Sequence, residues 1–368
     1  MLKGIFRFLM VMGLMLGLGL FLLYGNEIKT RLTQYQYLNE VETAMRKGHH
    51  KDVKRLLEEG VHQWPNEAMF HLRLAHYYHQ THQWEKAKEA YERGLDLHPT
   101  ADAYRYNYAR LLVQLREPNK AIQMYRMILN ESPQHLGALV DLASVYRFAG
   151  NRADALGFNE ERLMLWEWSR YYYSVALSMN PHSAKAWYGL SEVLQRDGQF
   201  EAASAGYCQA IRLVPSYTLA WFNLGLSEWY LEHEEHGMKL MNWAMQSYNR
   251  FHSQPLTEQS RTLHALRQTY FLVHKKHLRI THFDEAWIER IGDAHPKPPL
   301  KEEEFPPELL EACQGWRSVE LNTKRPKLKA ISMSRLNQAL SHVQASEEQK
   351  LGEAQALHKT QVKSIQRL

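Results

Sequence analysis

Five prolines recur along the chain at a nearly constant spacing. They are Pro65, Pro99, Pro133, Pro181 and Pro215, and the steps between them are 34, 34, 48 and 34 residues. Proline has no backbone N–H and cannot continue a helix, so each proline ends one helix and begins a turn. A fixed period of this length is typical of stacked helical repeats, in which each unit buries its apolar face against the next. The spacing therefore predicts an all-α solenoid.

Bulky, small and aromatic residues recur in register with the prolines. The unit that ends at Pro215 has the fullest set: Trp187, Leu190, Ser191, Leu194, Gly198, Ala203, Tyr207 and Ala210. This pattern resembles the tetratricopeptide repeat (TPR) family over residues 34–250, in about six units of which the last lacks its closing proline. The resemblance implies a right-handed superhelical solenoid of helix pairs. Small residues are expected where two helices approach closely, and large residues fill the space between them.

The single 48-residue step marks an insertion of 14 residues in the fourth unit, near residues 155–168. Residues from Leu139 to Gly150 mark the first helix of this unit, and an elongated second helix could carry the insertion on one face. Ala155 and Ser169 both remain candidates for the small position of that second helix. The inserted apolar residues either project as an interaction surface or pack on the neighbouring unit. They include Leu163, Trp166 and Trp168.

Residues 1–25 predict a transmembrane anchor. The stretch from Phe8 to Tyr24 contains no charge, and Gly4–Phe6 extend it to about the length that spans a bilayer. Lys3 and Arg7 precede it, which favours a cytoplasmic N-terminus and a single-pass protein with its repeats on the extracytoplasmic (periplasmic) side. The alternative is a cleaved signal peptide, but no small-x-small cleavage site follows the apolar stretch.

Gly13 and Gly17 are four residues apart within this stretch. That spacing lets two transmembrane helices pack closely, so the sequence allows a homodimer through these glycines. Glycine is common in transmembrane helices, so chance is the other explanation of the spacing.

The chain beyond the repeats is less regular. Residues 251–295 predict a helical cap over the open end of the solenoid, and residues 296–368 predict a proline-rich, charged linker with a flexible polar tail. Cys208 and Cys313 are far apart in sequence, and Cys208 falls within a repeat helix, where we expect a buried thiol. Nothing in the sequence requires a disulfide, so the redox compartment stays open.

No motif for catalysis is present in the sequence. It contains no phosphate-binding loop, no dinucleotide fingerprint and no nucleophile elbow. His76, His79 and His82 are closely spaced, but no cysteine or obvious carboxylate joins them, so we expect neither a metal nor a cofactor. The formal charge of +5 is small for 368 residues, which argues against nucleic acid as a partner. We expect a protein that is not an enzyme.

The binding surface follows from the TPR resemblance. In that family, five positions of each first helix line a concave groove. Carried over to this chain, they give a protein-binding groove that includes Arg46, His76, His79, Tyr106, Arg110, Arg147, Phe148, Lys185, Tyr188 and Arg196. Basic residues outnumber acidic ones at these positions and aromatic residues lie among them. The predicted ligand is therefore a protein segment with acidic and apolar residues, either extended or an amphipathic helix.

An anchor followed by TPR units is similar in architecture to bacterial envelope adaptors. The function we expect is a membrane-anchored scaffold that binds a protein partner and supports assembly of a membrane or envelope complex. Two alternatives remain open. One is an exported TPR chaperone after signal cleavage, and the other is an accessory subunit that binds a polysaccharide or a lipid-linked sugar.

Overall fold

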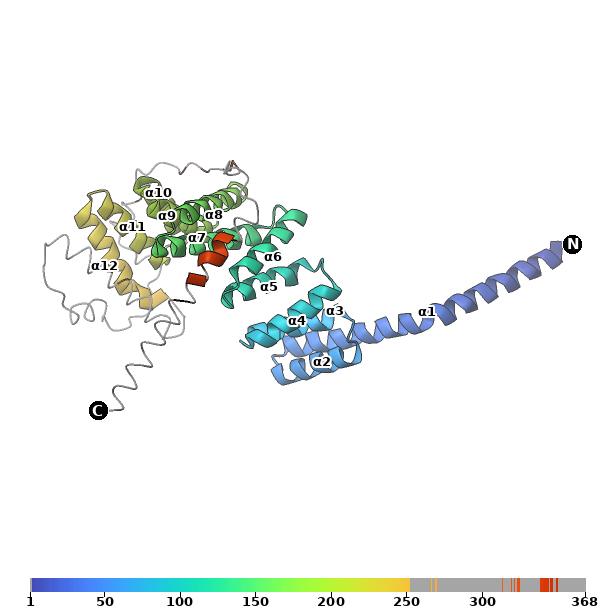
Figure 1. Cartoon of the computed structure of the whole chain (residues 1–368). Helices are drawn as coiled ribbons and strands as arrows, with labels where there is room; N and C mark the ends of the chain where they lie inside the picture. The colour runs from blue at the N-terminus through green and yellow to red at the C-terminus, as the bar shows by residue number, and fades with distance from the viewer. Residues whose placement is uncertain are drawn as a thin grey trace. The chain divides into compact units, whose positions relative to one another are not determined.

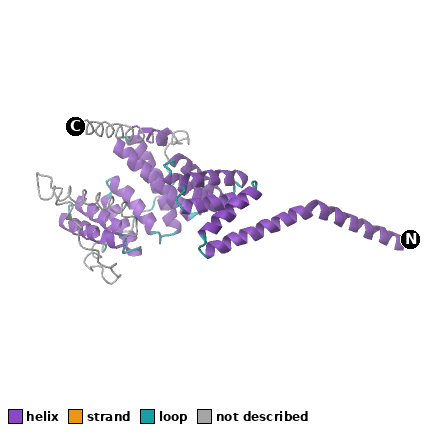
Figure 2. Ribbon diagram, turned by 90° about the horizontal axis from the view of Figure 1, so that it is seen from below, coloured by secondary structure: helices purple, strands orange, loops and turns teal. Residues whose placement is uncertain are grey.

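A computed structural model describes the backbone of residues 2–251 and a few later positions, which are 266, 269, 313, 319, 321, 323, 324, 338–343, 345, 346 and 349. Side chains are described for residues 24–245, for residue 247 and at those later positions. This part of the chain forms helices joined by short loops (Figures 1 and 2). The chain divides into two compact units, residues 1–124 (unit 1) and residues 125–368 (unit 2). Each unit is described by itself.

The helices follow the predicted repeat. Unit 1 contains α1 (Leu2–Arg46), α2 (His50–Gln63), α3 (Ala68–Gln80), α4 (Trp84–Leu97) and α5 (Asp102–Gln114), and α6 (Pro118–Glu131) crosses into unit 2. Unit 2 continues with α7 (Leu136–Leu156), α8 (Asn159–Met179), α9 (Ala184–Arg196), α10 (Phe200–Leu213), α11 (Thr218–Tyr230) and α12 (Glu234–Phe251). Successive helices pack as pairs, with α3 against α4, α7 against α8, α9 against α10 and α11 against α12. The all-helical repeat architecture is thus confirmed.

A residue with positive φ makes the turn inside most repeats. These residues are Gly48, His82, Arg116, Gly198 and Glu232, with φ of 70°, 59°, 61°, 78° and 68°. They recur at the period of the prolines, because every helix pair reverses direction at the same point of its repeat. A side chain in this left-handed region is strained, so three of these turns keep their geometry through the packing of the helices they join.

The fourth repeat departs from the expected pattern, and its insertion lengthens both helices. The first helix, α7, does not stop near Gly150 but runs to Leu156, and the left-handed turn residue is Gly157 with φ of 82°. The second helix, α8, begins only at Asn159. The prediction of an elongated second helix was therefore incomplete. The 14 added residues lengthen both helices, so that the hairpin consists of two 21-residue helices.

Small residues lie where paired helices touch, as predicted. Ser169 of α8 is fully buried and its hydroxyl donates to the Ala143 carbonyl at 2.8 Å, whereas Ala155 is exposed, so Ser169 takes the small position of the fourth repeat. In the last repeat, a Cβ added to Gly225 would lie 2.6 Å from the Gly237 carbonyl oxygen. No residue larger than glycine fits that contact between α11 and α12 without a shift of the helix backbone.

The N-terminal helix α1 is continuous over 45 residues, and its last part packs on α2. The predicted span from residue 8 to residue 24 lies within α1 and almost wholly among the residues whose side chains are not described. Among the described residues, no helix combines the length and the apolar character needed to cross a membrane.

The predicted cap and tail lie mostly outside the described residues. Of the cap, Leu266 and Thr269 are helical, and Leu266 packs on the core of unit 2. Of the predicted tail, several described residues are buried within unit 2: Cys313, Ala339, Leu340 and Val343. The division of the late sequence into cap, linker and tail stays a prediction.

Candidate functional site

The predicted groove residues fall on the first helices of the repeats in both units. Within unit 2, α7 lies against α9 and α9 against α11, so the first helices form one continuous face. We call it the first-helix face of unit 2. Within unit 1, α3 lies against α5 in the same way. The repeat thus brings residues far apart in sequence onto shared surfaces, and each set is described within its own unit.

In unit 1, two histidines of α3 line the contact with α5. The Nε2 atom of His79 lies 3.1 Å from Oε1 of Gln114, which joins the two helices. His76 lies 3.0 Å from the side-chain nitrogen of Gln80, its neighbour one turn later. Burial lowers the pKa of both histidines, and Arg110 contributes to the shift at His79. The neutral form of each ring is therefore favoured, which suits hydrogen bonding more than binding of an anion.

The other predicted residues of unit 1 are more open to solvent. The Arg110 guanidinium lies 6.0 Å from the ring centroid of Tyr106 on the same helix, a loose cation–π contact. Arg46 stands exposed in the last turn of α1. Arg110 and Arg46 are the exposed cations among the predicted groove residues of this unit.

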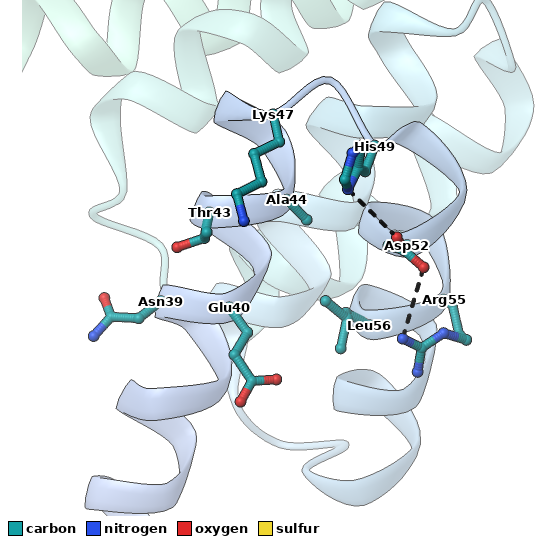
Figure 3. Close-up of a pocket in the computed structure, with 9 residues that line it drawn as sticks. All are labelled: Asn39, Glu40, Thr43, Ala44, Lys47, His49, Asp52, Arg55 and Leu56. Carbon is teal, nitrogen blue, oxygen red and sulfur yellow. Dashed lines mark ion pairs between the residues drawn. The ribbon is translucent and has the colours of Figure 1, made fainter.

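A pocket of about 450 Å³ lies beside the end of α1, where the sequence predicted none (Figure 3). It is lined by Asn39, Glu40, Thr43, Ala44, Lys47, His49, Asp52, Arg55 and Leu56. Asp52 lies 3.7 Å from His49 and 3.8 Å from Arg55, so charges of both signs meet at its wall. The charged side chains that line this pocket are exposed and partly pair with one another, so they offer little binding energy to a ligand.

In unit 2, the centre of the first-helix face is a buried ion pair. Arg147 of α7 donates to the carboxylate of Glu192 on α9, and only 7% of Arg147 is exposed. Its Nε lies 3.4 Å from the Tyr173 hydroxyl. Burial opposes the charge of this guanidinium, but Tyr173 and Glu192 raise the pKa of Arg147 above its usual range. Arg147 is therefore a cross-link between two repeats, already paired within the chain.

The same carboxylate organises the elongated hairpin. Asn151, one turn after Arg147, donates to the other oxygen of Glu192 at 2.9 Å, and the Trp166 indole N–H donates to the Asn151 oxygen at 3.0 Å. Asn151 lies on the added turns of α7, and Trp166 follows the added residues at the start of α8. Glu192 thus ties the longer hairpin to the following repeat, a link that a generic repeat pattern does not contain.

A second polar network holds α9 against α11. Asn223 donates to the Tyr188 hydroxyl at 3.0 Å, and the Tyr188 ring stacks on Tyr217 with centroids 4.8 Å apart. Gln195 donates to the Asn223 carbonyl and to the Ser227 hydroxyl, both at 2.8 Å. These bonds tie α9 to α11 through polar groups that are at least partly buried.

The remaining predicted cations of unit 2 also lie beside carboxylates. Lys185 is 2.6 Å from Asp141, and Arg196 is 3.7 Å from Glu192. Asp141 stands on α7 next to the groove positions, and the count of groove charges from the sequence did not include it. Because acidic partners stand beside Lys185, Arg196 and Arg147, the positive excess on this face is smaller than the sequence count implied.

Phe148 is the most exposed apolar residue of the first-helix face. It is 59% exposed, and its ring covers the Arg147 guanidinium at 4.2 Å. The cation–π contact holds the ring in place while one face stays open to solvent. Phe148 is therefore a preoriented apolar group at the centre of the predicted binding surface.

The inserted aromatic residues do not form one exposed patch. Trp166 is 2% exposed and packs against Gly150, where an added Cβ would lie 2.4 Å from its ring. Trp168 is half-buried and stacks with Tyr172, and Leu163 is 48% exposed. Of the two alternatives, an exposed interaction surface or packing on a neighbour, Trp166 follows the second. Of the three predicted residues, Leu163 is the one that is exposed.

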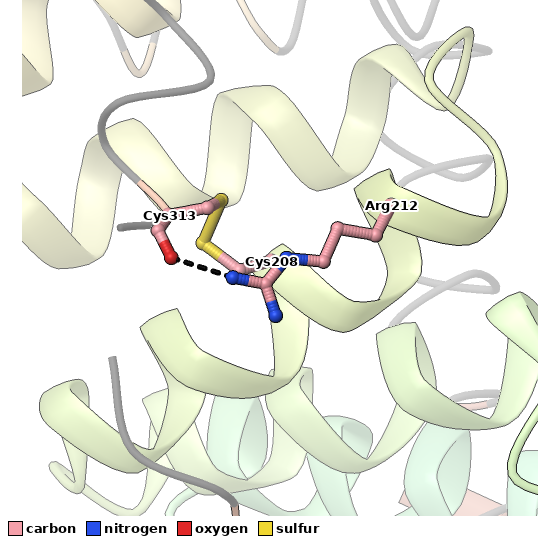
Figure 4. Close-up of a disulfide and its surroundings, with 3 residues drawn as sticks. All are labelled: Cys208, Arg212 and Cys313. Atoms are coloured by element: carbon pink, nitrogen blue, oxygen red, sulfur yellow. Dashed lines mark hydrogen bonds between the residues drawn. A yellow bond between two sulfur atoms is a disulfide. The ribbon is translucent and has the colours of Figure 1, made fainter. Parts of the chain in front are cut away.

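Sequence reasoning missed a disulfide between the two cysteines. Cys208 of α10 is bonded to Cys313, and the Arg212 side chain donates to the Cys313 carbonyl at 2.7 Å (Figure 4). Both cysteines are buried, so the prediction of a free buried thiol was wrong. A pair of cysteines 105 residues apart carries no signal in sequence, because only folding brings them together. Within the described residues, no three potential ligands gather to hold a metal ion.

The comparisons with known proteins agree with the repeat. Residues 82–135 match the family model described as "Tetratricopeptide repeat". A TPR protein structure from Parabacteroides merdae is 16% identical, with a TM-score of 0.52 over 77% of this chain and 99% of that one. The Pseudomonas aeruginosa PilF structure is 13% identical, with a TM-score of 0.47 over 59% of this chain and 92% of that one.

One curated human protein also matches over part of the chain. It is "Protein O-mannosyl-transferase TMTC1" from Homo sapiens, 28% identical over 171 residues. The match covers 40% of this chain but spans only 19% of the length of the human protein. The family match over residues 82–135 and the repeated helix pairs both support a tetratricopeptide repeat architecture for this chain.

Proposed function

We propose that the chain is a membrane-anchored TPR scaffold that binds a protein segment along the first helices of its repeats and supports assembly of a membrane or envelope complex. One observation carries this proposal: large apolar side chains stand exposed at groove positions of those helices. They are Met45 and Val113, at the repeat position of His79 and Arg147, and Phe148 and Tyr230, at the repeat position of Arg196, with 40%, 37%, 59% and 50% exposure in that order. Apolar groups repeated along such a surface favour a ligand that offers apolar side chains in register.

Charge is the secondary determinant of the ligand. Arg110 in unit 1 is exposed, and Lys185 in unit 2 is largely exposed although it contacts Asp141. An acidic side chain of a ligand can pair with Arg110 directly, or compete with Asp141 for Lys185. We therefore retain a segment with both acidic and apolar residues as the ligand, with the apolar residues supplying most of the affinity.

The placement at a membrane rests on the apolar stretch from residue 8 to residue 24 and on the basic residues before it. In this proposal the stretch anchors the chain, and the repeats lie on the extracytoplasmic side. The disulfide between Cys208 and Cys313 supports that side, because disulfides persist in oxidising compartments and are rare in the cytosol. The disulfide is equally compatible with an exported protein whose N-terminal segment has been cleaved. The mass of the mature N-terminus separates the two cases.

A role without catalysis is part of the proposal, since TPR surfaces serve mainly as scaffolds. The relative named as a mannosyltransferase suggests a second candidate, an accessory subunit that binds a lipid-linked sugar. The exposed aromatic rings of Phe148 and Tyr230 on the first helices favour this candidate, because sugars pack on open aromatic faces. Binding of the chain to vesicles that carry a polyprenyl-phosphate mannose, compared with vesicles that carry the unglycosylated lipid, tests it directly.

The main proposal is tested by photo-cross-linking of the full chain in its native membrane. A photoreactive phenylalanine analogue replaces Phe148 in one variant and Met179 in a control. Met179 is 39% exposed in the same unit but lies outside the predicted groove positions. The expected result is one protein adduct at position 148 that is at least about tenfold weaker at position 179. Equal adducts at both positions, or none at 148, would contradict a protein-binding first-helix face. Charge reversal of Arg147 is unsuitable, because that side chain is buried in an ion pair.

A further inference from the structure

The part of α1 between the predicted membrane span and the first repeat has one apolar face. Residues 26–36 contain only three apolar side chains, Ile28, Leu32 and Tyr35, and all three are exposed, at 57%, 58% and 65%. Tyr24 continues this set at 53% exposure. We call these four residues the α1 stripe. The other positions of residues 26–36 are polar or charged, so this part of the helix is amphipathic although its apolar side is uncovered.

The α1 stripe is not an extension of the surface that packs on the first repeat. At about 100° per residue, the four stripe residues fall within roughly 40° of one direction. Val41 and Ala44, which are buried where α1 meets α2, point to the opposite side of the helix on the same count. The stripe therefore faces away from α2, and burial in its own repeat cannot explain its apolar character.

The stripe continues in register with the two glycines of the predicted span. From Gly13 the positions Gly17, Phe21, Tyr24, Ile28, Leu32 and Tyr35 follow at steps of four, four and three, twice over. This is an 11-residue repeat, and a pair of helices that shares it winds with a right-handed twist. Helix pairs that meet through glycines four apart cross with the same hand. The glycine spacing and the exposed stripe are thus two independent signs of one surface along α1.

We propose that a second copy of this chain covers the α1 stripe, so that two α1 helices pair in parallel from Gly13 to Tyr35. An identical helix that enters from the same side of the membrane keeps the glycines and the stripe in register without further adjustment. Each residue then meets its own counterpart across a two-fold axis. The edges of the stripe are charged: Glu27 and Arg31 pair at 2.9 Å along one edge, and Lys29 lies along the other.

The pairing ends where the repeats begin. After Tyr35 the same side of α1 carries Asn39, Glu42 and Arg46, of which Glu42 and Arg46 are exposed and charged. Two copies would therefore separate at the first repeat and present two sets of TPR units at one place. This inference rests on the membrane anchor of the proposed function but not on ligand binding by the first helices.

Cysteine cross-linking in the full membrane-embedded chain tests the pairing. Single variants Ile28→Cys, Leu32→Cys and Tyr35→Cys are compared with Asn26→Cys, Thr30→Cys and Thr33→Cys on the opposite side of the helix. The native cysteines are already bonded to each other, so a mild oxidant reports on the new thiol. The expected yield of covalent dimer is at least about fivefold higher for the stripe positions. Equal yields on both sides, or no dimer at the stripe positions, would overturn the proposal.

A second measurement separates pairing from ligand binding. Ile28→Ser with Leu32→Ser should abolish energy transfer between differently labelled copies, and Thr30→Ser with Thr33→Ser should leave it unchanged. Serine in place of leucine and isoleucine removes the apolar surface from an exposed position, where folding of the repeats does not depend on it. If the stripe variant stays paired, the inference fails. A retained photo-adduct at Phe148 in that variant would show that the proposed function survives this failure.

Discussion

After four of the five recurring prolines, the side chain six residues later contacts the backbone carbonyl of that proline. Each of these carbonyls follows the end of a helix and has no hydrogen-bond partner within that helix. The Trp187 indole donates to the Pro181 carbonyl at 2.8 Å, and the Trp221 indole donates to the Pro215 carbonyl at the same distance. His71 and Arg105 contact the carbonyls of Pro65 and Pro99 in the same way. After Pro133 the residue is Leu139, whose side chain has no N–H to donate.

The variant Trp187→Phe tests this role. It keeps an aromatic ring but leaves the Pro181 carbonyl without its donor, so we expect the free energy of unfolding to fall by about 1–3 kcal/mol. Urea denaturation followed by circular dichroism measures the change. Tyr230→Phe is the control, because it removes a polar group from a half-exposed ring of the same unit and should cost less than about 0.5 kcal/mol. Equal losses in the two variants would contradict a specific role for the indole N–H.

Two histidines make unit 1 sensitive to acid. Burial lowers the pKa of His76 and His79 from the ordinary value of 6.5, so the unfolded chain takes up protons more readily than the folded one. Their contribution to stability is complete above pH 6.5 and is lost as the pH falls through the lowered folded values. We expect the melting temperature to drop between about pH 7 and pH 5, and to drop less in His76→Gln with His79→Gln. The variant His62→Gln, at an exposed position of the same unit, should keep the full drop.

The long hairpin of α7 and α8 is the element that departs from its neighbours. Asn151 on its added turns joins the next repeat through Glu192 and accepts a hydrogen bond from Trp166, and its tip carries Phe158. The Phe158 ring stacks on His342 at 4.4 Å, and His342 lies 3.7 Å from Glu161. The insertion thus offers two surfaces that an ordinary repeat lacks, one toward the following repeat and one toward the C-terminal part of the chain.

A double-mutant cycle measures the contact at the hairpin tip. Phe158→Ala and His342→Ala should each destabilise unit 2, and the combined variant should lose less than the sum, by about 0.5–1.5 kcal/mol. The reason is that either change alone already removes the stacking. Gln338→Ala, at an exposed position of the same helical segment, should be additive with Phe158→Ala. Additivity of Phe158→Ala with His342→Ala would show that the stacking contributes nothing.

At the scale of the whole molecule, one covalent bond links the repeats to the chain that follows them. The disulfide joins Cys208 in α10 to Cys313, and Val319 and Leu321 pack on the core of unit 2 beside it. A cross-link that closes a loop of this length restricts the unfolded chain strongly, typically by about 2–4 kcal/mol. The bond therefore holds buried apolar residues of the late sequence against the solenoid.

Reduction of this bond should destabilise unit 2. We expect a reductant to lower its thermal transition by several degrees, which scanning calorimetry with and without the reductant measures. The variant Cys208→Ser with Cys313→Ser should start from the lower temperature and show no response to reductant. A response in this variant would mean that the reductant acts elsewhere, and no response in the unaltered chain would mean that the bond carries no stability.

Much of the repeat could be read from the sequence, because its determinants are local. Proline ends a helix wherever it stands, and small and large residues at fixed positions of a helix decide which face another helix can approach. These rules placed the helix pairs, and they placed Phe148 and Arg147 on the first helices. They failed at Gly150, because the 48-residue step gave the length of the insertion but not how two helices would share it.

The sequence by itself determined the repeat, its period and the helices that carry the binding surface. Only the tertiary structure decided which charges remain available there, since Asp141 and Glu192 reach Lys185 and Arg147 from neighbouring helices. It also decided the pairing of Cys208 with Cys313 and the burial of Trp166. The physical reason is the range of each interaction. Helix formation and its termination depend on residues a few positions apart, whereas ion pairs, disulfides and burial depend on distances that folding alone establishes.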